Sequence, residues 1–283
     1  MESKLNKFNL VLVSYLNTYP IVWGLRRLER RYQPMAKLCP PSQCTRALIE
    51  GFADLALVPS ITLLKYPQSF EVLPLGIVAE REVDTVLLVG NSPLEAWKIV
   101  LLDNDSLTSV QLTKILFRLK NLTPVFIRGL GGIESLDHET GALMIGNKCF
   151  HLASRFTYRY DLSRMWFDLT GLPFVFALFL FKPTSDRETL VNAYEMISEA
   201  ITCGLANLDQ VIDDWMKEDH SNEVIRDRAY YHDYLTNKIS YPLTLRAIQG
   251  LKKFYDYCEE ALPPEKAGRL TRDYFHHFDR LLT

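Results

Sequence analysis

Small hydroxyl and amide residues gather at turns where an apolar, strand-like run gives way to a helical pattern. These turns are Ser14 to Thr18, Pro41–Ser42, Val58 to Ser60 and Asp105 to Ser109. Uncharged hydroxyl and amide groups donate hydrogen bonds, and the first turn of a helix adds unpaired N–H groups and a positive dipole end. Each turn taken alone is better explained as a helix cap. Several of them in one chain indicate a cleft that binds a carboxylate or a phosphate.

The elements that must position these turns alternate between strands and helices through the first two-thirds of the chain. The predicted strands are 9–13, 35–38, 53–58, 83–89, 98–102, 124–127, 142–145 and 174–181. The predicted helices are 16–30, 42–50, 105–119, 187–203, 208–217, 243–257 and 273–282. Alternation of this kind predicts parallel sheets covered by helices on both faces. Such sheets bind ligands at the carboxyl ends of their strands, which is where the turns lie.

Composition narrows the class of protein. The chain has 283 residues, of which 48% are apolar, so it can form one large domain or two smaller ones. Its 32 basic and 34 acidic residues leave a net charge of −2, so no basic excess attracts nucleic acid. The longest apolar run, 172–181, is shorter than the roughly 20 residues that span a bilayer. We therefore expect a cytoplasmic protein that binds neither nucleic acid nor membrane.

The cysteines and the motifs that the sequence lacks argue against a disulfide-bonded, nucleotide-binding or metal-binding protein. The cysteines are odd in number and widely spread, so we predict free thiols in a reducing compartment. No P-loop, dinucleotide fingerprint or H-E-x-x-H motif occurs, and the adjacent His276 and His277 would point about 100° apart on a helix. We expect no metal and no cofactor. The aromatic stretch 229–234 lacks basic residues and is interpreted as a packing element.

Three segments carry a resemblance to a known family. The first is Val13 to Pro20 (VSYLNTYP), the second runs from Leu102 to Ser109, and the third from Asp161 to Ala177 contains TGLPFVFA. They resemble, in the same order, motifs of the chorismate dehydratases of the futalosine route to menaquinone. Weaker similarities occur at 51–60 and 237–243, so the resemblance covers roughly residues 10 to 255.

The resemblance implies an α/β fold of the type II periplasmic-binding-protein class, with a helical C-terminal region. In this fold two lobes are joined by two crossover strands, expected here near 84–90 and 174–181. Lobe one would hold residues 1–89 plus 182–283, and lobe two residues 90–181, with the ligand between them.

The resemblance also implies a reaction, the loss of water from chorismate to give 3-[(1-carboxyvinyl)oxy]benzoate. Aromatisation drives this elimination, so the site needs donors that hold two carboxylates and exclude water rather than a strong acid–base pair. The small-molecule dicarboxylate is the one partner expected. The catalytic or positioning candidates are Asn17, Ser14 and Thr85. The substrate-binding candidates are Ser60, Ser106, Thr108, Ser109, Asn147, Thr170 and Gly171.

Two departures from the family pattern leave alternatives open. Asn147 stands where the family commonly has Asp, and Phe179 stands where it tends to have Trp. One alternative is 1,4-dihydroxy-6-naphthoate synthase, which would need a catalytic histidine, and lobe two offers only His138 and His151. The other is a non-catalytic carboxylate-binding or sensor protein, which normally carries an export signal or a fused module.

Overall fold

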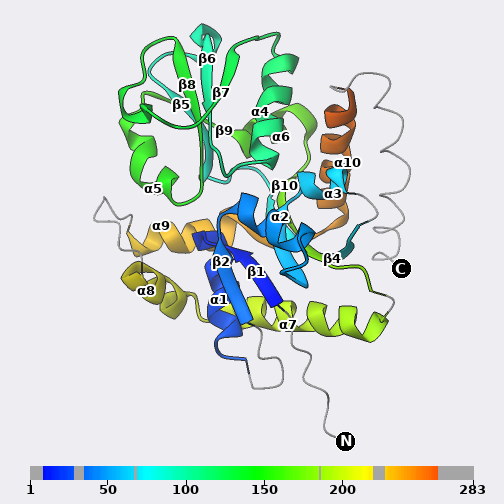
Figure 1. Cartoon of the computed structure of the whole chain (residues 1–283). Coiled ribbons are helices and arrows are strands. Elements are labelled where there is room, and N and C mark those ends of the chain that lie inside the picture. Colours follow the sequence, from blue (N-terminus) through cyan, green and yellow to red (C-terminus); the bar gives the residue numbers. More distant parts are fainter. Residues whose placement is uncertain (1–8, 29–34, 67–68, 185, 219–226, 261–283) are drawn as a thin grey trace, which may run out of the picture.

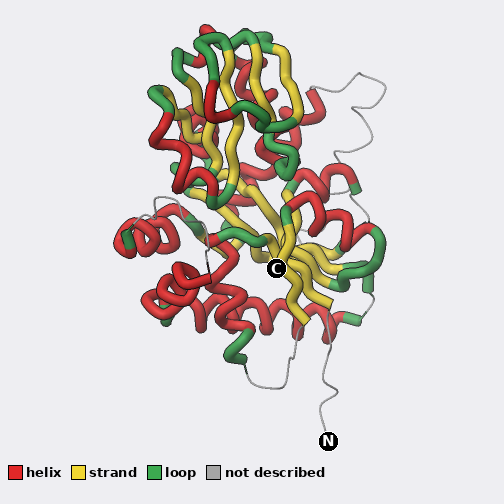
Figure 2. The backbone as a smooth tube through the Cα atoms, turned by 60° about the vertical axis from the view of Figure 1, so that its left-hand side comes forward, coloured by secondary structure: helices red, strands yellow, loops and turns green. Residues whose placement is uncertain are grey.

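The chain folds into two α/β lobes, each built on its own sheet and placed one above the other in Figure 1. The computed structural model describes residues 9–28, 35–66, 69–184, 186–218 and 227–260. The predicted helix at 273–282 lies outside these residues. The two sheets occupy separate halves of the molecule, with helices flanking them (Figure 2). The predicted α/β architecture with two lobes is confirmed.

The lower lobe contains a six-stranded sheet with the order β11-β4-β10-β3-β1-β2. Its strands are β1 (Asn9–Val13), β2 (Met35–Cys39), β3 (Leu55–Pro59), β4 (Glu71–Ala79), β10 (Phe174–Phe181) and β11 (Ser240–Pro242). β1 pairs in parallel with β2 and β3, whereas β10 runs antiparallel to β3 and β4. All residues of β10 are buried, as expected of an apolar strand in the middle of a sheet covered on both faces.

The upper lobe contains a five-stranded sheet with the order β7-β6-β8-β5-β9. Its strands are β5 (Val86–Gly90), β6 (Ile99–Leu102), β7 (Val125–Arg128), β8 (Thr140–Ile145) and β9 (Tyr158–Asp161). β6 is parallel to β7 and β8, but β5 is antiparallel to β8 and β9. The prediction of wholly parallel sheets is therefore wrong. A parallel neighbour needs a crossover that returns the chain to the same end of the sheet, whereas β5 and β10 arrive from the other lobe.

The pairing of β5 and β10 bears on where the two lobes meet. The predicted division places most of β5 in lobe one, and β5 pairs within the upper sheet. It places β10 in lobe two, and β10 pairs within the lower sheet. From this pairing we propose lobe boundaries before β5 and before β10, a few residues from the predicted 89/90 and 181/182.

Six of the described helices lie close to predicted positions, namely α1 (Tyr19–Leu25), α2 (Pro41–Ile49), α4 (Thr108–Leu119), α7 (Arg187–Leu205), α8 (Leu208–Glu218) and α10 (Leu245–Glu260). The sequence analysis did not predict α3 (Ile61–Lys65), α5 (Lys148–Leu152), α6 (Leu162–Thr170) and α9 (Arg228–Asp233). Short 3-10 turns add η1 (Leu16–Thr18), η2 (Leu94–Ala96), η3 (Ile133–Ser135) and η4 (Ala153–Arg155), and Tyr234–Lys238 form a π-helical turn. α1 packs against α7, and α10 contacts both β10 and α4, so the last described helix touches both lobes. No described helix combines the length and apolarity needed to cross a membrane.

Two helix starts differ from the prediction in ways that affect the cleft. α2 begins at Pro41, so Ser42 is not its cap, and the Ser42 hydroxyl donates instead to the Asp105 carboxylate of the upper lobe at 3.1 Å. α4 begins at Thr108, and residues 105–107 form the turn that leads into it. Both differences place polar side chains across the gap between the lobes.

Candidate functional site

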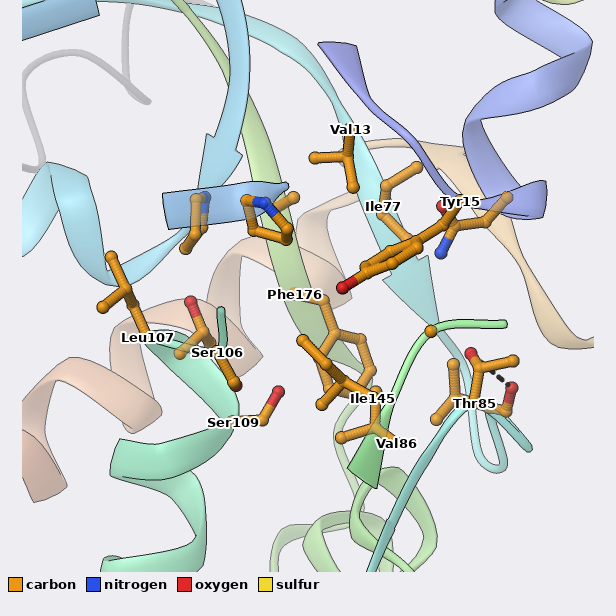
Figure 3. A pocket seen from close by; sticks show the side chains of 17 residues that line it. Val13, Tyr15, Ile77, Thr85, Val86, Ser106, Leu107, Ser109, Ile145 and Phe176 are labelled. Atoms are coloured by element: carbon orange, nitrogen blue, oxygen red, sulfur yellow. Dashed lines mark hydrogen bonds between the residues drawn. The ribbon is translucent and has the colours of Figure 1, made fainter. Parts of the chain in front are cut away.

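A cavity between the lobes brings together polar side chains from both of them. We call it the inner cavity, and its volume is about 70 Å³. Its polar lining residues are Tyr15, Asn17, Thr85, Ser106, Thr108 and Ser109. Apolar residues of the lower sheet and of the lobe connections, among them Ile77 and Phe176, complete the wall (Figure 3). Among the described residues, no charged side chain lines this cavity.

Asn17 forms part of the lower side, in the 3-10 turn η1 that begins three residues after the end of β1. Its backbone carbonyl accepts a hydrogen bond from the Tyr241 hydroxyl at 2.9 Å, and its side-chain Oδ1 accepts one from Thr18 at 3.1 Å. The Asn17 side chain also hydrogen-bonds the hydroxyl of Tyr234. Asn17 is therefore fixed on its backbone and on its side chain while it remains half-buried at the cavity.

Thr85 lies on the connection between the lobes and shares the same tyrosine. Its Oγ1 donates to the Val83 carbonyl at 3.2 Å and hydrogen-bonds the Tyr234 hydroxyl at 3.0 Å. Tyr234 is only 1% exposed, and burial is the main cause that raises the pKa of its phenol. It opens the π-helical turn, an irregularity found frequently at functional sites. A single buried hydroxyl thus holds Asn17 and Thr85 together.

The upper side is the N-terminus of α4. The Thr108 hydroxyl accepts from the backbone N–H of Ile61 at 3.2 Å and lies 3.4 Å from Ser60 Oγ, so it binds the lower lobe. Within the described part of the chain, the Ser106 and Ser109 hydroxyls have no hydrogen-bond partner, and Ser109 projects into the cavity in Figure 3. The first turn of a helix also leaves N–H groups without intrahelical partners. This side can therefore bind an anion.

Charged groups behind the cavity hold the turn that precedes α4. Arg128 donates from Nη1 to the carbonyls of Asp103 and Ser106, at 3.0 Å each. Lys148 pairs with the carboxylate of Asp103, which is 3% exposed. Because both cations lie outside the lining of the inner cavity, they orient the turn without placing a charge beside a ligand.

A second cavity, which we call the outer cavity, lies on the other side of Tyr15 and measures about 190 Å³. Its lining includes Ser14 and Asn147, two of the five predicted site residues that are absent from the inner lining. Asn147 Oδ1 accepts from the backbone N–H of Leu16 at 3.0 Å, which joins the two lobes. The amide that replaces the family's usual aspartate therefore makes a contact between the lobes in this chain.

Three other predicted residues lie away from both cavities. Ser60 is fully buried, and its hydroxyl donates to the Val175 carbonyl at 2.8 Å. Thr170 ends α6, where its hydroxyl donates to the Trp166 carbonyl at 2.9 Å. Gly171 follows it with a φ of +68°, a left-handed cap that glycine adopts without strain. Hydrogen bonds to carbonyls account for the two hydroxyl residues, and the left-handed conformation accounts for the glycine. The predicted contact of these three residues with a ligand has no support from their positions.

The two histidines that the alternative enzyme would need are also outside the site. His138 lies in the loop before β8, with Nδ1 3.2 Å from the Asn91 carbonyl oxygen. His151 lies on α5 and is 8% exposed. Neither lines the inner or the outer cavity. Among the described residues, no group of three or more His, Cys, Asp or Glu side chains is arranged to hold a metal ion.

Tyr15 and Tyr234 are the residues that the sequence analysis missed. Tyr15 stands inside the VSYLNTYP motif, so its neighbours Ser14 and Asn17 were the available signal. Tyr234 stands in the aromatic stretch interpreted as packing, and its ring does pack on Phe150, with centroids 5.3 Å apart. Its hydroxyl contacts residues far away in the sequence, which no local pattern indicates.

Comparison with known proteins identifies the family of the chain. A family described as "Menaquinone biosynthesis" matches residues 9–260. A chorismate dehydratase of Thermus thermophilus is 32% identical over 190 residues, which are 60% of this chain and 69% of that protein. A chorismate dehydratase of Campylobacter jejuni is 29% identical over 178 residues, 62% of this chain and 65% of that protein. The chain thus matches about two-thirds of the length of these relatives.

Solved structures support the fold class. A protein from Archaeoglobus fulgidus superposes with a TM-score of 0.75 at 14% identity, covering 91% of this chain and 98% of that one. The periplasmic aliphatic sulphonate binding protein SsuA of Escherichia coli gives a TM-score of 0.62 at 15% identity, covering 90% and 87%. At these identities the likeness concerns the fold alone, and it confirms the periplasmic-binding-protein class. With the family match over 9–260, the chain belongs to the menaquinone-biosynthesis family.

Proposed function

We propose that this protein is a chorismate dehydratase, a lyase that eliminates water from chorismate to give 3-[(1-carboxyvinyl)oxy]benzoate. The observation that carries the proposal is the inner cavity, where uncharged donors of both lobes face one space. The similarity to two chorismate dehydratases supports it.

The chemistry of the elimination fits an uncharged site. The proton leaves the ring carbon that bears the enol-ether oxygen, the hydroxide leaves the neighbouring carbon, and the electron pair completes the aromatic ring. Because the product is aromatic, the enzyme mainly has to hold the two carboxylates, stabilise the developing charge and exclude bulk water. Fixed hydroxyl, amide and N–H donors do this in a dry cavity.

The residues divide into two roles. Asn17 and Thr85, held by the Tyr234 hydroxyl, act at the reacting part of the ring. Ser106, Ser109 and the first N–H groups of α4 hold a carboxylate. Since no acidic or basic side chain lines the inner cavity among the described residues, the proton acceptor is the enolpyruvyl carboxylate of the substrate itself.

The size of the cavity indicates that the lobes part to admit substrate. A ligand pocket usually measures about 300–1,000 Å³, and the inner cavity has about 70 Å³. The hydrogen bonds that cross the gap beside it include Leu16 to Asn147, Ser42 to Asp105, and those of Thr108 to Ile61 and Ser60. We infer that the structure is the closed form and that these bonds break on opening.

The buried thiols support a reducing cellular compartment. Cys39 and Cys44 are buried as free thiols, and their sulfur atoms lie 3.3 Å apart as hydrogen-bond partners. Free cysteines are typical of proteins kept in the reducing cytoplasm. We infer that the enzyme acts there.

Incubation of the purified protein with chorismate tests the function. The expected result is loss of chorismate absorbance and a product whose mass is lower by one water. Tight binding without turnover would support a sensor or carboxylate-binding protein instead. The 1,4-dihydroxy-6-naphthoate synthase alternative has no support from the positions of His138 and His151.

A further inference from the structure

Tyr15 occupies the boundary between the inner and outer cavities and lines both of them. It lies two residues after the end of β1, and its side chain reaches from the lower lobe to Gly146 of the upper one. Its hydroxyl projects into the inner cavity, on the opposite side from Ser109 (Figure 3). The residue is therefore placed to touch whatever the cavity holds.

The hydroxyl of Tyr15 is free to bind a ligand. Within the described part of the chain, it has no hydrogen-bond partner. Burial raises the pKa of its phenol far above the usual value, and the charges of Asp103 and Asp105 raise it further. The group therefore remains protonated and can act only as a neutral hydroxyl. A half-buried phenol without a protein partner has already lost part of its hydration. A ligand that accepts its hydrogen bond compensates for this loss.

The ring of Tyr15 is fixed by a glycine of the upper lobe. Gly146 has a φ of +73°, and a Cβ added there would lie 2.4 Å from Tyr15 Cε1. Only a residue without a side chain lets the ring lie so close to the backbone. The lower lobe thus supplies the phenol and the upper lobe supplies the surface that orients it, so the placement depends on closure of the lobes.

We propose that Tyr15 is a substrate-binding residue whose hydroxyl donates a hydrogen bond to the carboxylate held at the N-terminus of α4. The ring then forms the wall that separates the bound substrate from the outer cavity. The proposal rests on the proposed function, because it takes the ligand to be a cyclic dicarboxylate. It adds to the site a donor that comes from the lobe opposite Ser106 and Ser109.

Tyr15→Phe tests the hydroxyl while it keeps the ring. A hydrogen bond to a charged group is worth enough that its loss lowers affinity about ten- to a hundredfold. We expect kcat/KM for chorismate to fall, and the Kd of 3-[(1-carboxyvinyl)oxy]benzoate to rise, by this factor, with an unchanged melting temperature. The matched control is Tyr194→Phe, because Tyr194 is exposed on α7. Values for Tyr15→Phe within twofold of the wild type would overturn the proposal.

The two monomethyl esters of the product identify the group that Tyr15 contacts. Esterifying the carboxylate that accepts the hydrogen bond should shrink the difference between the wild type and Tyr15→Phe, because a neutral ester oxygen is a weaker acceptor than a carboxylate. Esterifying the other carboxylate should leave the difference in place. If neither ester shrinks the difference, the hydroxyl contacts no carboxylate and the assignment is wrong. These binding experiments do not need turnover, so a wild-type protein that fails to convert chorismate would refute the proposed function and leave this test intact.

Discussion

The two sides of the inner cavity are held in place by different chemistry. On the lower side, Asn17 is fixed by the hydroxyls of Tyr234 and Tyr241, which are 1% and 2% exposed. On the upper side, the turn before α4 is fixed by Arg128, an exposed residue, and by Lys148, which is 35% exposed. One support belongs to the buried core and the other to the surface.

This difference separates two ways of losing activity. Buried hydroxyls are bonded inside a packed environment, so removing one disturbs both the site and the stability of the fold. Surface charges are partly solvated, and each contributes little to stability. The lower side should therefore couple catalysis to folding, whereas the upper side should allow substrate binding to change while stability stays constant.

The largest effect on activity is expected at Asn17, which hydrogen bonds hold in place on the lower side of the cavity. Asn17→Ala removes a fixed donor, and by analogy with oxyanion-hole variants it should cost about 2.7–4 kcal/mol of transition-state stabilisation, a loss of roughly 10²–10³ in kcat. Steady-state turnover of chorismate measures it, with thermal unfolding as the check on folding. If well-folded Asn17→Ala and Ser106→Ala both keep near-full turnover, the cleft has been assigned wrongly.

The next effect is on the pH dependence of stability, at Asp161. This residue hydrogen-bonds the segment that connects the two lobes. Its carboxylate accepts from the backbone N–H groups of Val83, Asp84 and Arg164, yet burial raises its pKa to about 6. Between pH 4 and 6 the folded protein therefore holds the proton more firmly than the unfolded chain does. This contribution to the free energy of unfolding should fall, by on the order of 2 kcal/mol, as the pH rises through that window.

Asp161→Asn isolates this contribution because it removes the titrating group. Denaturant unfolding of both proteins at pH 4 and pH 7 measures it. The free energy of unfolding of the wild type, relative to Asp161→Asn, should decrease with rising pH. A relative stability that stays constant or increases would contradict the raised pKa.

A smaller effect is expected for Tyr234→Phe, which keeps the aromatic packing on Phe150 and removes the hydroxyl. Loss of its hydrogen bonds to Thr85 and Asn17 should lower kcat about five- to tenfold. The same loss should lower the free energy of unfolding by about 1 kcal/mol. Tyr66→Phe, at an exposed position, is the control. Unchanged kcat in Tyr234→Phe would remove the proposed link between the buried tyrosine and catalysis.

The smallest effect is expected on the upper side. Arg128→Met loses two hydrogen bonds to the turn before α4, at an exposed position, so KM should rise about two- to tenfold with nearly unchanged stability. Arg159→Met changes an exposed arginine of β9 and serves as the control. A large loss of stability in Arg128→Met would show that the two sides are not supported differently.

Local patterns in the sequence were sufficient for most elements and for part of the site. Apolar runs and helix periodicity placed the strands β1, β2, β6 and β10 and the helices α7 and α8 within a few residues. The strand-end turns placed Asn17, Ser106, Thr108 and Ser109, which the fold does bring to one cavity. This works because a strand end followed by a polar turn is a local feature, and each of the two sheets presents such strand ends at the gap between the lobes.

Other features depended on contacts that no local pattern contains. The Thr85–Tyr234 bond joins residues 149 positions apart, and the Tyr241–Asn17 bond joins residues 224 apart. Ser60 resembles Ser106 in sequence context, but packing turns its hydroxyl to a carbonyl of β10. A hydroxyl takes whichever partner the fold presents, so its role is decided only when the chain closes around it.

The sequence by itself determined that the protein is an α/β protein with uncharged donors at the strand ends, because side-chain periodicity and turn chemistry act over a few residues. The division into two lobes was implied by the family resemblance. Only the tertiary structure decided which donors share a cavity, which ones join the lobes, and that Tyr15 stands between the two cavities. These outcomes depend on how two separate sheets pack against each other. Packing of that kind is settled by shape and burial over the whole molecule.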